Sequence, residues 1–157
     1  MKKIILICFC SLLTVNLYSQ DVNKIKSQNV FFILFESNDY MQKTDLSREK
    51  TEDSFRYEYF HKKINKFKFS FRYWDYKNFD DAYNKIRKTI TFRLNKSFLR
   101  KNKDIIITRE FMEDLGEQAL ISLLNGSNKH VFLIDKSEIK KGKILLREVS
   151  FNFIVVE

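Results

Sequence analysis

The chain has very little glycine, cysteine or proline, and each shortage removes a class of function. In 157 residues it contains no proline, three glycines and two cysteines. Both cysteines, Cys8 and Cys10, fall in the first ten residues, so the rest of the chain has no thiol to act as a nucleophile, ligate a metal or form a disulfide. The glycines (Gly116, Gly126 and Gly142) stand too far apart for a glycine-rich phosphate-binding loop.

Residues typical of enzyme active sites are also scarce. The two histidines, His61 and His130, have no acid or second histidine at ligand spacing, and there is no Gly-x-Ser-x-Gly or Ser-x-x-Lys motif. We therefore expect no catalytic, cofactor-binding or metal-binding residues. Acidic pairs leave one alternative, a small secreted hydrolase that uses paired carboxylates. The groups are Asp80 with Asp81, Glu113 with Asp114, and Asp45 with Glu49 and Glu52.

Residues 1–19 are typical of a cleavable secretory signal. Lys2 and Lys3 precede a mostly apolar run over residues 4–15. Such a run fits a signal core of about 7–15 residues and falls short of the ~20 needed to span a bilayer. Ser19 provides a small residue at the cleavage point, so the mature chain should begin at Gln20 or Asp21. We expect no integral membrane segment after cleavage, and a final location in the periplasm or outside the cell.

The net charge has two explanations. It is +9, and loss of Lys2 and Lys3 would leave 27 basic against 20 acidic residues. A basic exported protein can bind nucleic acid, anionic lipid or acidic polysaccharide. Codon bias would produce the same excess, because Lys outnumbers Arg 21 to 8 and the chain is rich in Ile, Phe and Asn. Composition alone does not separate the two.

Without repeats or linkers, the sequence predicts a flexible polar leader over residues 20–28 and one globular domain over residues 29–157. The continuous apolar run 30–35 predicts a strand buried on both faces. Residues 37–53 are polar and predict a long loop or a short irregular helix. Alternation of aromatic with polar residues over 55–59 and 66–73 predicts a hairpin with its turn near residues 61–65. Its inward face would carry Phe55, Tyr57, Tyr59, Phe67, Phe69, Phe71 and Tyr73.

Two helices and two strands follow. Asn78 or Asp80 can cap a helix that extends to Ile90, and residues 91–100 suit either a helix or a strand. Thr108 should cap a second helix with an apolar stripe from residue 111 to residue 124, and Gly116 inside it suggests close helix–sheet contact. Strands over residues 131–134 and from Leu145 onward close the chain. The order β-β-β-α-α-β-β predicts an α+β fold, an antiparallel sheet of about five strands with two helices on one face.

The most suggestive surface combines cations with an aromatic residue. The outward hairpin face should present Arg56, Lys66, Lys68 and Arg72, with Trp74 at its end, and residues 85–103 contain eight basic residues and no acid. Such a face can bind a polyanion or a glycan, although lysines on a sheet also simply discourage aggregation. The favoured hypothesis is an exported non-enzymatic domain that binds a protein, a glycan or another polyanion in the cell envelope or outside the cell.

Overall fold

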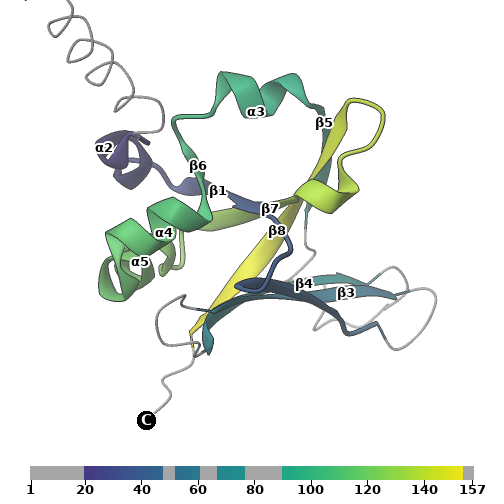
Figure 1. The fold of residues 1–157 in the computed structure, drawn as a ribbon, viewed down its shortest axis with the longest axis horizontal. Coiled ribbons are helices and arrows are strands. Elements are labelled where there is room, and N and C mark those ends of the chain that lie inside the picture. Colours follow the sequence, from purple (N-terminus) through teal and green to yellow (C-terminus); the bar gives the residue numbers. More distant parts are fainter. Residues whose placement is uncertain (1–19, 48–51, 61–66, 77–89, 154–157) are drawn as a thin grey trace, which may run out of the picture.

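The structure, a computed structural model, describes residues 20–47, 52–60, 67–76 and 90–153. It has the α+β class expected from the sequence, but the sheet is larger than predicted and not purely antiparallel (Figure 1). Residues 1–19, which the sequence predicts to be a secretory signal, and residues 78–89 of the first predicted helix lie outside the described residues. The strands are β1 (Val30–Phe35), β2 (Met41–Asp45), β3 (Glu52–Phe60), β4 (Phe67–Tyr76), β5 (Thr91–Asn95), β6 (Ile106–Ile107), β7 (His130–Asp135) and β8 (Lys143–Phe153).

The sheet has eight strands in the order β2-β3-β4-β8-β7-β1-β6, with β5 pairing to β8 beside this path. Its centre corrects the antiparallel prediction, because β1 runs parallel to both β7 and β6. A parallel pair needs a crossover connection, and α4 (Arg109–Leu115) and α5 (Glu117–Leu124) lie within the connection that returns the chain to β7. The continuous apolar runs of β1 and β7 are typical of strands buried on both faces, as parallel strands are, but core strands of antiparallel sandwiches show the same runs, so the pattern does not fix strand direction.

The predicted hairpin is confirmed. Strands β3 and β4 pair in antiparallel register from Glu52↔Tyr76 to Phe60↔Phe67, with Phe55 directly opposite Tyr73. The aromatic face is inward, since the side chains of Tyr57, Tyr59, Phe69, Phe71 and Tyr73 are all buried. The predicted loop over residues 37–53 contains a third strand of this unit, β2, which pairs with β3. The sequence did not predict β2 because most of its residues are polar, and Met41 is the only residue of this strand that is buried.

Strand β8 connects the two halves of the sheet. Figure 1 shows it running from the turn beside β5 down to the β3–β4 hairpin. Its first part pairs with β5 and β7, and its last part, from Ser150 onward, pairs with β4. Leu145 is half-buried and Val149 is buried, as expected of one face, but Ile144 and Leu146 on the other face are buried as well. The strand therefore lies between two core clusters.

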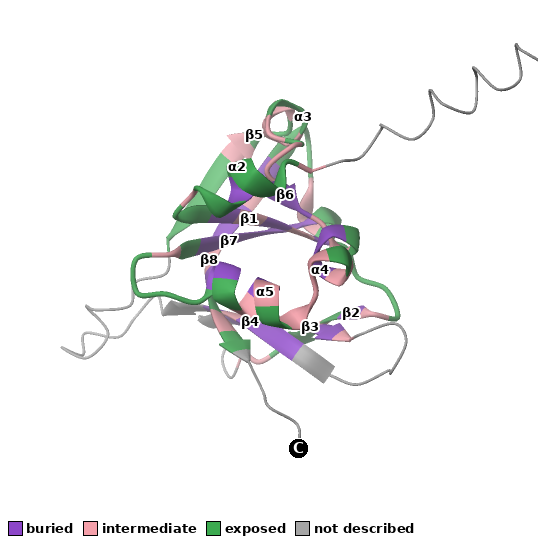
Figure 2. Cartoon of the chain, turned by 90° about the vertical axis from the view of Figure 1, so that its left-hand side faces the viewer, coloured by how far each residue is buried: buried purple, intermediate pink, exposed green. Residues whose placement is uncertain are grey.

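The core clusters occupy opposite faces of the central strands. The larger contains alternate residues of β1 and β7 with the hairpin aromatics and buried residues of α4 and α5. The smaller contains Phe132, Ile134, Ile144 and Leu146, against which Phe98 and Leu99 pack from α3 (Ser97–Lys101). Figure 2 shows the buried residues concentrated in the central strands, with α3 and β5 more exposed.

The helices differ from the predictions in three places. Residues 20–28, expected to be a loose leader, contain α2 (Val22–Lys26), whose Ile25 is buried in the larger core cluster. Residues 91–100 contain both a strand and a helix, β5 and α3. Thr108 caps α4 as predicted, but the expected single helix is divided at Gly116, where φ is +79°. A Cβ at Gly116 would meet nothing within 4 Å, so backbone conformation, rather than close packing, requires glycine there.

Candidate functional site

The hairpin surface predicted from the sequence is only partly described. Arg56 and Arg72 lie directly opposite each other in the β3–β4 register, and both are half-buried. Lys66 lies outside the described residues; Lys68 and Trp74 lie on β4, but their side chains are not described. Ser54 and Ser70, on the same outward face, are buried at 1% and 5% exposure. The face is therefore less open than a solvated hairpin surface would be.

A second group of cations forms where β5 pairs with the start of β8. Asn95 lies opposite Lys143, and the amide of Lys96 donates to the carbonyl of Gly142 at 2.8 Å. This pairing brings the basic segment around β5 and α3 next to the turn at residues 140–143, which the sequence predicted only as a polar turn between two strands. We call the following group the basic end: Arg93, Lys96, Arg100, Lys101, Lys140, Lys141 and Lys143. All seven are exposed.

The charges of the basic end are not compensated by neighbouring acids. None of the seven forms an ion pair with a carboxylate in the described ranges. The sequence explains this, since residues 90–103 and 139–147 contain no aspartate or glutamate. Exposed like charges held close together raise the local potential and attract anions from solution. The sequence identified the first segment of this surface and missed the second, whose only signal was three lysines around Gly142.

The turn that carries Lys140, Lys141 and Lys143 has an unusual backbone. Lys140 and Lys143 exchange backbone hydrogen bonds of 3.2 and 2.9 Å, which closes a two-residue turn. Both central residues have positive φ, +49° at Lys141 and +71° at Gly142. This is the pattern of a type I′ hairpin turn, which favours Asn or Gly at both positions. Lysine there costs about 1 kcal/mol of backbone strain, so turn geometry does not explain why residue 141 is a lysine.

Four charged side chains form a network at the two ends of the β7–β8 connection that contains this turn. Lys43 of β2 places its Nζ 3.0 Å from Asp135 Oδ2 and 2.8 Å from Glu138 Oε1. Arg147, only 7% exposed, pairs with the other oxygen of Glu138, and its guanidinium lies 5.3 Å from the ring centre of Phe55. Asp135 and Glu138 lie at the start of the β7–β8 connection. The network therefore holds the start of the connection that contains the lysine turn against β2 and β8.

The network is balanced in charge, and two of its members, Asp135 and Arg147, are buried, while Lys43 and Glu138 are half-buried. Burial lowers the pKa of Lys43, but its bonds to Glu138 and Asp135 outweigh burial and the pKa is raised overall. Arg147 behaves in the same way, with burial opposing and Glu138 raising its pKa. Burial raises the pKa of Tyr57 to about 12, and its buried hydroxyl has no hydrogen-bond partner among the described residues. The two cations and two carboxylates neutralise one another here, so the network is better suited to stabilising the fold than to transferring a proton.

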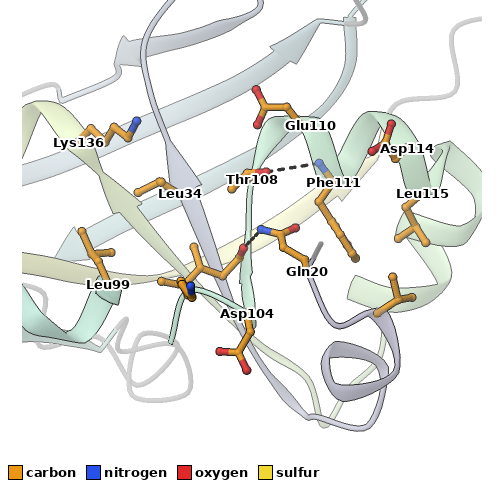
Figure 3. A pocket seen from close by; sticks show the side chains of 13 residues that line it. Gln20, Leu34, Leu99, Asp104, Thr108, Glu110, Phe111, Asp114, Leu115 and Lys136 are labelled. Carbon is orange, nitrogen blue, oxygen red and sulfur yellow. Dashed lines mark hydrogen bonds between the residues drawn. The ribbon is translucent and has the colours of Figure 1, made fainter. Parts of the chain in front are cut away.

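A pocket of about 840 Å³ lies between α2, α4 and β6. It bears on the hydrolase alternative because several acidic residues line it. Its lining includes Asp104, Glu110 and Asp114, and Figure 3 shows these carboxylates at separate points around the opening. Asp104 pairs with Lys24, and this bond lowers the pKa of Asp104. A backbone hydrogen bond is the main cause of the lowered pKa of Glu110. A catalytic general acid needs a raised pKa, so neither of these two acids suits that role.

No protein-family model, curated protein or solved structure matches this chain. Among the helices of the described segments, none has the length and hydropathy needed to cross a membrane. A function therefore has to be inferred from the chemistry of the chain's own residues.

Proposed function

We propose that the protein is exported and, in the periplasm or outside the cell, binds an anionic partner through the basic end without catalysing a reaction. Export is supported by the Lys2-Lys3 start and the apolar run after it. Binding is supported by one observation above the others: the β5–β8 pairing brings two separate acid-free segments with seven exposed cations to one part of the fold, and none of these cations pairs with a described acid. Codon bias can raise the number of lysines, but it does not explain a lysine at a strained turn position.

The hydrolase alternative has less support. It needs one carboxyl with a raised pKa near a second, ionised carboxylate. The acids around the pocket are spread over its rim, and the pKa of Asp104 and that of Glu110 are lowered. Binding of an anion requires no such arrangement, because attraction between exposed charges and release of counterions supply the free energy.

The test is the affinity for a fluorescent heparin fragment, measured by anisotropy between about 50 and 200 mM salt. A surface with six to ten phosphate or sulfate contacts loses about 10³–10⁵ in affinity over that range. The double variant Arg93→Ser, Lys96→Ser should bind more weakly. The control is Lys24→Ser, Lys26→Ser, which removes the same charge from exposed positions on α2. Equal losses in the two variants would mean that only net charge matters and would refute a localised site.

Two further variants sharpen the result. Arg56→Ser, Arg72→Ser tests the hairpin face, and a larger loss there than at the basic end would move the site to the hairpin. Lys141→Gly should weaken binding while raising the free energy of unfolding by about 1 kcal/mol, because glycine accepts the positive φ without strain. A variant that is more stable but binds less cannot owe its defect to unfolding. Unchanged affinity would remove Lys141 from the site.

A further inference from the structure

Within the described residues, strand β5 has one edge that pairs with no other strand. Along its other edge it pairs with β8, where the amide of Glu148 donates to the carbonyl of Ile90 and the amide of Lys96 donates to Gly142. In an antiparallel pair the backbone groups of alternate residues point to opposite edges. Residues 90, 92, 94 and 96 therefore face β8, and Thr91, Arg93 and Asn95 direct their N–H and C=O groups to the other edge. Within the described ranges no strand pairs with that edge.

The same strand exposes apolar surface. Phe92 is 46% exposed and Ile90 is 45% exposed, the two largest values among the exposed large hydrophobic residues of the described chain. The Phe92 ring lies 5.8 Å from the ring centre of Phe132, at the margin of the smaller core cluster. On the opposite face of β5, Thr91 is hydrogen-bonded to Tyr73 and Arg93 is exposed. An unpaired edge thus has an apolar strip on one face and a cation on the other.

We propose that β5 receives an extended acidic segment of a partner protein, which adds to the sheet as a further strand. This rests on the proposed function and names the partner's class. Backbone groups of Thr91, Arg93 and Asn95 would pair with the segment, which is the usual source of affinity in strand addition. Apolar residues of the segment would contact Ile90 and Phe92, and alternate acidic residues would lie beside Arg93 on the other face. The expected ligand therefore alternates apolar and acidic residues.

Other occupants fit less well. Pairing of β5 with β5 of a second copy would bring two sets of Arg93 and Lys96 together, and like charges across a strand pair are destabilising. A glycan or nucleic acid would use the cations but has no peptide groups for the strand edge. Charged residues can protect an edge from pairing. Protection alone, however, would not leave Phe92 half exposed beside it.

The experiment uses a ten-residue peptide that alternates glutamate with valine, with binding measured by calorimetry. Its comparison peptide carries N-methyl groups on alternate amides, the ones that would donate to β5. We expect methylation to weaken binding about tenfold or more, because two or three backbone hydrogen bonds are lost. Equal affinity of the two peptides would overturn strand addition.

Variants and a second ligand separate this inference from the proposed function. Phe92→Ser should weaken binding of the peptide and leave heparin affinity unchanged, whereas Val22→Ser, a matched loss of an exposed apolar side chain on α2, should change neither. Heparin binding without any peptide binding would refute the inference and leave the proposed function standing. Failure of both ligands would refute both. A dimer seen by light scattering and abolished by Arg93→Pro, which removes the outward N–H of the edge, would assign the edge to a second copy and overturn the proposal.

Discussion

Replacing Glu138 with glutamine should destabilise the protein strongly, although the substitution preserves the size and shape of the side chain. Among the described residues, Glu138 is the only carboxylate that contacts both cations of this network, one oxygen pairing with Lys43 and the other with Arg147. Lys43 keeps a second partner, because Asp135 lies 3.0 Å away. Arg147 has no second carboxylate partner in the described chain, and only 8% of its side chain is exposed. The variant would therefore leave a buried guanidinium without a counter-charge.

The expected cost is at most about 3–5 kcal/mol, the range found when one partner of a fully buried ion pair is removed, because Glu138 itself is 24% exposed. Arg147→Met should cost less than Glu138→Gln. It removes one of the two partners of Glu138, whose side chain is 24% exposed and still contacts Lys43, while methionine continues to pack against Phe55 and Tyr73. The double variant Glu138→Gln, Arg147→Met removes one charge of each sign, and Lys43 remains paired with Asp135. It should therefore be more stable than Glu138→Gln alone, which makes the two substitutions non-additive.

Urea unfolding followed by circular dichroism measures all three free energies. Thermal melts should agree, with a fall of roughly 10–20 °C for Glu138→Gln in a domain of this size. The control is Arg93→Met, the same change at an exposed position on β5, which should lie within about 0.5 kcal/mol of the parent. Simple additivity of Glu138→Gln and Arg147→Met, or a cost below about 1 kcal/mol for the first, would refute the reasoning.

Three further predictions concern the core and the backbone. The pKa of Tyr57 is raised to about 12, so its contribution to stability is fully present below pH ~10 and is lost as the pH rises toward 12. Thermal melts across this pH range should therefore show a smaller loss of stability for Tyr57→Phe than for the parent protein. Phe69→Ala should cost about 3–5 kcal/mol in urea unfolding, since the ring is buried and stacks 4.7 Å from Tyr59, while Gln42→Ala, exposed on β2, should be neutral. Gly116→Ala should cost about 1–2 kcal/mol by the same assay through its positive φ alone; a stabilising effect would mean that α4 and α5 can join.

The local elements that were predicted correctly are those whose signals lie within a few residues. A period of two identified the β3–β4 hairpin, and Thr108 identified the start of α4. Errors arose where distant segments decide the structure. Strand β2 has little apolar character of its own, but β3 supplies a partner along its whole length. Helix α2 is short and polar, and it forms where Ile25 enters a core built from remote strands.

By itself, the sequence determined which residues are available for chemistry: no thiol after Cys10, few glycines, and a basic segment without acids. It also determined the α+β class, because hydrophobic periodicity is a property of neighbouring residues. Only the tertiary structure decided the direction of the central strands and the location of the basic end. Strand β5 and the lysine turn are nearly fifty residues apart in the chain, and the β5–β8 pairing that joins them depends on which edge of β8 remains open once β7 occupies the other. That choice is made by packing across the whole sheet, so no local pattern around Arg93 or Lys141 could have predicted it.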